Sequence, residues 1–205
     1  MARHAFTLLG VMTLIMSVGV FVAFNKKAEA PTQEHEIITD TKAIDHMSLS
    51  LTSPAFSNGE IIPSEYTCDG ENVSPELRID NIPEGTKSLV LVMDDPDIPE
   101  SVQRARGIEK FDHWAVYNIP ATTGLIPRGE VVGNVGINSK GEMAYTGACP
   151  PDREHRYFFR LYALRGTLTF IKTPTLIEIE EAAKGIEIEH TTLMGRYERK
   201  GIKTI

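Results

Sequence analysis

The stretch SLVLVMDDPDIP, residues 88–99, joins an unbroken apolar run to a turn that carries three carboxylates. A short apolar run bounded by turn signals is typical of a strand that is buried on both faces. Proline removes a backbone donor and fixes φ, so Asp95-Pro96-Asp97-Ile98-Pro99 cannot continue the strand ladder and predicts a rigid turn. Taken alone, this acidic turn is either a surface feature or one wall of a binding site.

The segments around this stretch predict a mainly β domain, because short strands alternate with proline and glycine turns. Further strands are expected over residues 48–53, 77–79, 111–120, 157–164 and 191–198, and residues 100–110 and 121–141 are expected to be loops. Within 111–120, alternation places His113, Ala115 and Tyr117 on one face and Trp114, Val116 and Asn118 on the other. One helix is expected after Thr175, where Thr-Leu-Ile-Glu forms a capping box.

Composition indicates one globular domain. The 205 residues are 41% hydrophobic and 24% charged, which is enough apolar content for a full core. The formal net charge is −7, and residues 31–205 alone carry 18 basic against 27 acidic residues. A nucleic-acid-binding protein needs a basic face, so no nucleic-acid partner is expected.

The N-terminus carries a separate signal. Residues 5–24 hold no charged side chain, and Lys26 and Lys27 follow them. The length of this run favours a membrane anchor in the form of a hydrophobic helix, whereas the Ala28-Glu29-Ala30 ending is typical of a cleaved signal peptide. Residues 1–30 are therefore predicted to be a signal peptide or a membrane anchor through 5–24, residues 31–47 a linker, and residues 48–205 the folded domain. In either case the domain is expected to be exported, as a periplasmic, secreted or membrane-anchored protein.

A second dense patch lies at residues 144–157. The adjacent prolines at 150 and 151 predict a stiff extended segment, and Gly147 before them permits close backbone approach. His155 and Tyr157 are two residues apart at the start of a predicted strand, so both project from one face. This pair is either an anion cradle or a surface pair at a strand end.

Five motifs occur in order along the chain: Tyr66-Thr67-Cys68-Asp69-Gly70, Asp95-Pro96-Asp97-Ile98-Pro99, Asp112-His113-Trp114, Cys149-Pro150-Pro151 and His155-Arg156-Tyr157. With the final Gly195-Arg196-Tyr197, they resemble the phosphatidylethanolamine-binding protein family, specifically its bacterial Raf-kinase-inhibitor-like branch, from about residue 48 to residue 199. The resemblance implies a β-sandwich-like fold around a large central sheet with a few short helices. It also implies a small pocket for phosphate-type or phospholipid-headgroup ligands, built from Asp95, Asp97, His113, Pro150, His155 and Tyr157. Backbone amides near Gly147 and Ala148 are expected to supply further donors to the anion.

Three functions follow from this resemblance and from the residues. The favoured one is a binding protein rather than an enzyme, because no Gly-X-Ser-X-Gly elbow and no nucleophile beside its base is found. The alternatives are an inhibitor or regulator of a kinase or protease, and a weak hydrolase that uses Asp95 and His113 as an acid–base pair. No cofactor or metal is expected. The oligomeric state stays open, with a homodimer as one alternative.

The two cysteines, Cys68 and Cys149, both lie beside turns. In an exported domain an even pair favours a disulfide, and two buried free thiols are the alternative.

Overall fold

The computed structural model describes residues 47–200. The predicted N-terminal signal peptide or anchor, the linker up to residue 46 and residues 201–205 lie outside the described residues. In the described part, neither helix has the length and apolar character that crossing a membrane would require.

The domain is mainly β, as predicted. Its elements are β1 Ser50–Thr52, the 3-10 turn η1 Ser64–Tyr66, β2 Leu77–Asp80, β3 Ser88–Asp95, α1 Glu100–Arg106, β4 Phe111–Pro120, β5 Leu125–Ile126, β6 Asn134–Val135, β7 His155–Leu164, α2 Leu176–Lys184 and β8 Glu187–Tyr197.

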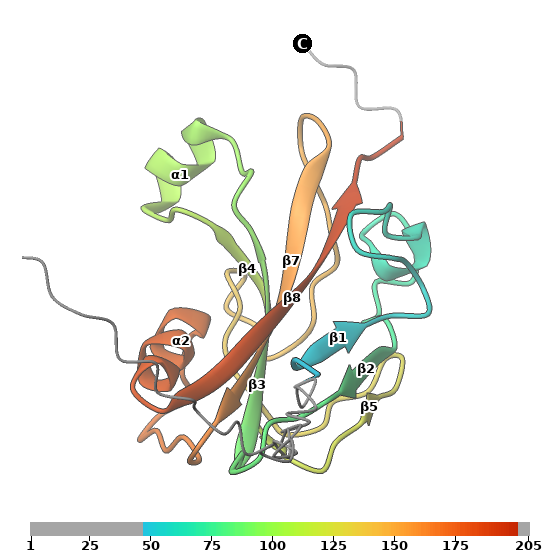
Figure 1. Ribbon diagram of the computed structural model, residues 1–205. Coiled ribbons are helices and arrows are strands. Elements are labelled where there is room, and N and C mark those ends of the chain that lie inside the picture. Colours follow the sequence, from blue (N-terminus) through green and yellow to red (C-terminus); the bar gives the residue numbers. More distant parts are fainter. Residues whose placement is uncertain (1–46, 201–205) are drawn as a thin grey trace, which may run out of the picture. The chain divides into compact units, whose positions relative to one another are not determined.

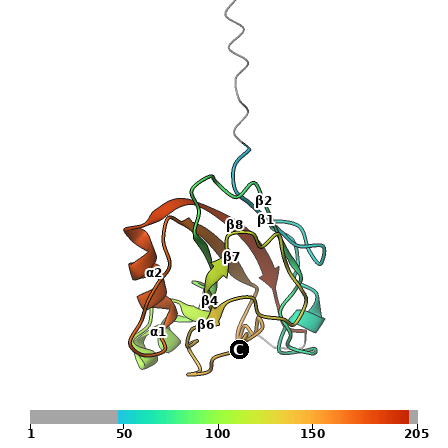
Figure 2. The ribbon, with the colours of Figure 1, turned by 90° about the horizontal axis from the view of Figure 1, so that it is seen from below.

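These strands form two antiparallel sheets. The central sheet has five strands in the order β6-β4-β3-β7-β8, and the smaller sheet has three in the order β1-β2-β5. The two helices lie on one side of the central sheet, and β1 and β2 lie on the other (Figure 2). The β3 strand is in the middle of the central sheet (Figure 1), which explains why its sequence is apolar without a break.

Alternate residues of β3 serve two separate cores. Leu89, Leu91 and Met93 pack into the core between the two sheets, while Val90 and Val92 pack into a second core with α2. All five side chains are fully buried. The capping box predicted for α2 is confirmed, since Thr175 Oγ1 accepts from the Glu178 amide and the Glu178 carboxylate accepts from the Thr175 amide.

The predicted alternation in β4 is wrong at two residues because the strand is bulged twice. Met93 pairs with Trp114 and Asp94 pairs with Asp112, so His113 is an extra residue between them. A bulge re-aims the side chain of the extra residue. The His113 ring consequently contacts Tyr157 on the side of the inter-sheet core, away from Ala115.

The second bulge lies between Leu89 and Leu91. At this bulge the backbone of Asn118 is in the left-handed conformation, with a φ of 55°. The Asn118 amide exchanges two hydrogen bonds with the backbone of Leu168, which belongs to the α2-side core.

Three other segments differ from expectation. Residues 100–106 form α1 instead of a loop, beginning after Pro99 and ending at Gly107, whose φ of 65° suits a helix C-terminus. None of the α1 residues is buried, so the helix carries no apolar period that would reveal it. Residues 121–141 contain the two short strands β5 and β6, and β8 begins at Glu187 rather than at Thr191, with His190 exposed inside it.

Candidate ligand-binding pocket

A cavity of about 330 Å³ opens beside α1, at the end of the central sheet where β3 ends and β4 begins. Its wall is formed by Asp95, Ile98, Pro99, Val102, Arg106, Phe111, His113, Lys140, Thr146, Cys149 and Pro151. The acidic turn after β3 therefore lies in the wall of a cavity. Of the six residues that the family resemblance points to, Asp95 and His113 line the cavity directly.

Both carboxylate oxygens of Asp95 are already engaged. Oδ2 is 2.7 Å from His155 Nδ1, and Oδ1 accepts the Asp97 amide at 2.8 Å. The other ring nitrogen of His155 is 2.8 Å from Asp152 Oδ1, so the ring lies between two carboxylates. Burial opposes a charge on this ring, but hydrogen bonds and attraction from the two carboxylates outweigh it and raise the pKa of His155. His155 thus favours the imidazolium form, which neutralises Asp95 from behind the cavity wall.

The His113 ring is held in one orientation. Its Nδ1 lies 2.7 Å from the Thr146 carbonyl oxygen, which only accepts, so Nδ1 carries the proton. Burial lowers the pKa of His113, so the ring favours the neutral form. Among residues 47–200 no hydrogen bond reaches Nε2. Asp95 bonds to His155 instead of His113, and this arrangement does not favour the acid–base pair of the hydrolase alternative.

Tyr157 lies behind His113. The two rings meet edge to face with centroids 5.3 Å apart, and Tyr157 also stacks on His155 at 6.5 Å, so the prediction that His155 and Tyr157 share one strand face is confirmed. Tyr157 Oη is buried, and no group in the described part of the chain meets it in good hydrogen-bond geometry, although Asp95 and the Cys149 backbone lie close enough to shift its pKa. Burial, reinforced by the charge of Asp95, raises the pKa of this phenol, which therefore stays a hydrogen-bond donor.

Asp97 and Pro150 lie beside the cavity. The Asp97 carboxylate turns toward Arg156 and accepts from Nε at 2.8 Å, from Nη2 at 2.7 Å and from the Arg156 amide at 3.0 Å. The Arg156 guanidinium lowers the pKa of Asp97 despite partial burial. Asp97 therefore ties the acidic turn to the start of β7. Pro150 is buried between the lining residues Cys149 and Pro151.

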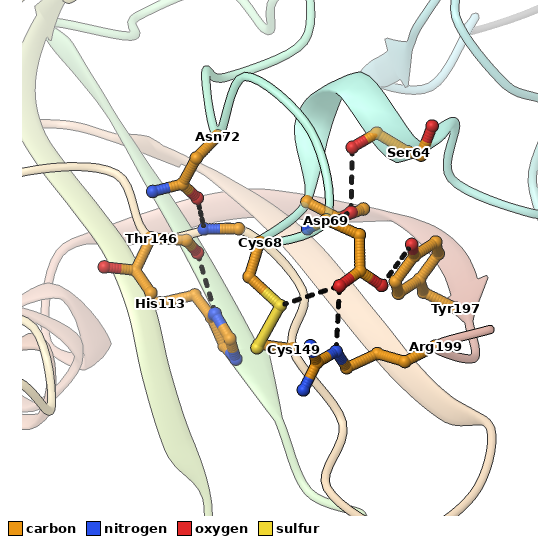
Figure 3. The surroundings of a disulfide bond; sticks show 11 residues. Ser64, Cys68, Asp69, Asn72, His113, Thr146, Cys149, Tyr197 and Arg199 are labelled. Carbon is orange, nitrogen blue, oxygen red and sulfur yellow. Dashed lines mark hydrogen bonds and ion pairs between the residues drawn. A yellow bond between two sulfur atoms is a disulfide. The ribbon is translucent and has the colours of Figure 1, made fainter. Parts of the chain in front are cut away.

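A disulfide supports the wall on the Cys149 side. The sulfurs of Cys68 and Cys149 are bonded, with Cα atoms 5.4 Å apart, and both residues are exposed rather than buried (Figure 3). Next to the bond, Asp69 accepts from Tyr197 Oη at 2.9 Å and from Arg199 Nε at 2.9 Å, which attaches the end of β8.

Gly147 packs against the 66–72 loop, which leaves its amide unavailable to an anion. That amide donates to Asn72 Oδ1 at 2.7 Å, so the expectation that it donates to a ligand is wrong. A Cβ at this position would lie 2.5 Å from the Tyr66 carbonyl oxygen. Gly147 is therefore needed for the close approach of the two segments.

Sequence reasoning missed the apolar wall and the cationic rim of the cavity. Ile98 and Pro99 belong to the predicted turn, Val102 belongs to the helix that was expected to be a loop, and Phe111 lines the cavity from β4. Arg106 ends α1, and Lys140 lies in the connection between β6 and β7. The only local signals for α1 were Pro99 before the helix and Gly107 after it. Nothing in the sequence shows that residue 140 lies beside residue 106.

Comparison with known proteins identifies the family. The family model for phosphatidylethanolamine-binding protein matches residues 52–198. The chain is 41% identical over 152 residues to a UPF0098 protein of Chlamydia pneumoniae, covering 74% of this chain and 99% of that protein. It is similar to the crystal structure of the phosphatidylethanolamine-binding protein homologue CT736 from Chlamydia trachomatis, with a TM-score of 0.70, 40% identity and coverage of 75% and 99%. YbcL of E. coli, whose structure is described as a member of the mammalian PEBP family, matches with a TM-score of 0.66, 28% identity and coverage of 75% and 99%. The chain therefore belongs to the phosphatidylethanolamine-binding protein family.

Proposed function

We propose that this chain is an exported binding protein whose pocket holds the phosphoryl group of a small molecule or lipid headgroup. One observation carries the proposal: within residues 47–200, no hydrogen bond reaches His113 Nε2, and this ring lies in the wall of a cavity that Arg106 and Lys140 also line. Tyr157 Oη, buried behind the His113 ring, also has no partner in good hydrogen-bond geometry there. A buried polar group without a partner costs free energy, so a ligand that supplies the missing hydrogen bond is favoured.

The chemistry of these groups suits a phosphate monoester. The Tyr157 hydroxyl donates to a phosphoryl oxygen, and neutral His113 Nε2 accepts from a protonated phosphoryl oxygen or takes up its proton. The arginine and lysine side chains at the rim attract the anion. The name of the family, which the similar protein CT736 shares, agrees with this class of ligand.

Titration of inorganic phosphate into the full chain, followed by NMR of the histidine ring nitrogens, tests the proposal. We expect His113 Nε2 to shift to saturation. His190 is the internal control, because its ring is exposed on β8 and paired with Glu187, away from the cavity. A His113→Gln variant should lose the binding while keeping the fold. An unmoved His113 ring at saturating phosphate would reject the proposal.

Export is supported by the disulfide, because disulfides persist in oxidising compartments. Cell fractionation followed by N-terminal sequencing of the recovered protein tests this part. Recovery from the reducing cytoplasm with both thiols free would count against it.

A further inference from the structure

We infer that the pocket selects phosphate monoesters with an uncharged apolar substituent and disfavours esters that carry an ammonium group, such as phosphoethanolamine. This inference rests on the proposed function and names the ligand class of the same cavity. It predicts that the pocket disfavours the headgroup for which the family is named.

The size and lining of the cavity point to a substituent. Pockets for organic ligands start at about 300 Å³, and this cavity of about 330 Å³ has room beyond a phosphoryl group. Beside the polar residues of the lining, Ile98, Val102 and Phe111 form an apolar wall. Inorganic phosphate would leave that wall in contact with water. An alkyl or aryl substituent would cover this wall, and each methylene that it buries would increase the affinity about fourfold.

The charges around the cavity argue against an ammonium group. Asp95 is the only acidic residue in the described lining, and His155 neutralises it from behind. Two further carboxylates nearby, on Asp97 and Asp152, are also paired with basic side chains. Neutral His113 adds no charge. The carboxylates of Asp95, Asp97 and Asp152 are therefore already compensated.

The cavity lining also contains two basic residues, Arg106 and Lys140. Neither Arg106 nor Lys140 forms an ion pair within residues 47–200. Arg106 lies over the Phe111 ring at 5.7 Å from its centroid, and its Nη1 is 3.4 Å from the Ser139 carbonyl oxygen. The Lys140 amide donates to Asn138 Oδ1, which fixes the turn that carries it. These two cations attract a phosphoryl dianion and repel an ammonium group that would enter beside it.

A matched pair of probes isolates the effect. Propyl phosphate and O-phosphoethanolamine have the same number of heavy atoms and differ only in a terminal methyl against an ammonium group. Calorimetry on the full chain at low salt should give propyl phosphate the tighter binding, by on the order of tenfold, which is the size of two unit-charge repulsions in water. Inorganic phosphate should bind more weakly than propyl phosphate.

Three variants separate the two causes. Arg106→Gln combined with Lys140→Gln should reduce the preference for propyl phosphate over O-phosphoethanolamine by on the order of tenfold. Arg104→Gln is the matched control, because Arg104 is on the same helix but pairs with Glu100 and does not line the cavity. Val102→Ser should weaken propyl phosphate by about fourfold and leave inorganic phosphate unchanged.

Soluble and lipid sources of the ester are distinguished by co-sedimentation with phosphatidylcholine vesicles that contain phosphatidic acid. If the protein sediments with the vesicles and propyl phosphate reverses this, the ester comes from a lipid. If the protein binds propyl phosphate but not the vesicles, the ester is a soluble molecule. Both results support a pocket that disfavours an ammonium group. Equal affinities for the two matched esters, or a preference unchanged in the double variant, would overturn the inference while leaving the proposed function intact. Failure of inorganic phosphate and both esters to bind would instead overturn the proposed function.

Discussion

Removal of the disulfide is expected to cost a large part of the stability of this domain. Cys68 and Cys149 are separated by 81 residues, and their bond restricts the unfolded chain far more than the folded one. In the chain-entropy relation, a loop of this length corresponds to about 4.5 kcal/mol at 25 °C. For a domain of about 150 residues, such a loss lowers Tm by roughly 10–18 °C.

The assay is urea unfolding of the Cys68→Ser, Cys149→Ser double variant beside the oxidised protein, with circular dichroism as the signal. Serine leaves the neighbouring Asp69 contacts to Tyr197 and Arg199 in place, so the comparison measures the cross-link alone. A reducing agent should bring the wild type to the stability of the variant and should not change the variant. A loss below about 1 kcal/mol would refute the entropic reasoning, because the unfolded loop would then already be closed by other contacts.

Three further changes have defined outcomes. Gly147→Ala should destabilise the fold by about 1–3 kcal/mol in thermal melts through overpacking, whereas Gly185→Ala, whose Cβ would meet no heavy atom within 4 Å, should be neutral or stabilising. Burial raises the pKa of Asp112 to about 6, so the free energy of unfolding of the wild type falls as pH rises from about 4 through 6. Asp112→Asn should remove this pH dependence and raise the free energy of unfolding at pH 8 by up to about 3 kcal/mol, as measured by urea titration at each pH. The raised pKa of His155 gives stability that is complete below about pH 6.5 and is lost as pH rises through the folded-state pKa; His155→Gln should abolish this second slope, and its persistence would show that another group causes it.

Local sequence signals were sufficient for most of the secondary structure. The apolar run before the acidic turn produced β3, alternation produced β7, and the Thr175 capping box produced α2. These elements depend on propensity and periodicity among near neighbours, which a single sequence records. The acidic turn also could be recognised as rigid, because two prolines restrict its backbone whatever surrounds it.

The candidate site depended more on tertiary structure. His113 reaches the cavity because the bulge opposite Met93 and Asp94 re-aims it, and a bulge arises from strand pairing that the β4 sequence alone does not specify. The short helix α1 is marginal as an isolated segment, since seven residues cannot offset the cost of helix nucleation without the fold around them.

The sequence by itself determined the strands, the acidic turn and the family motifs, whereas only the fold decided which residues share the cavity. Arg106 and Lys140 come from separate connections, and Asp95 is paired to His155 from another strand. Their proximity follows from the antiparallel pairing of β3 with both β4 and β7, which brings distant segments to one end of the sheet. Such long-range contacts produce no periodic pattern in the sequence, because the local pattern of a segment is the same whichever distant segment it packs against.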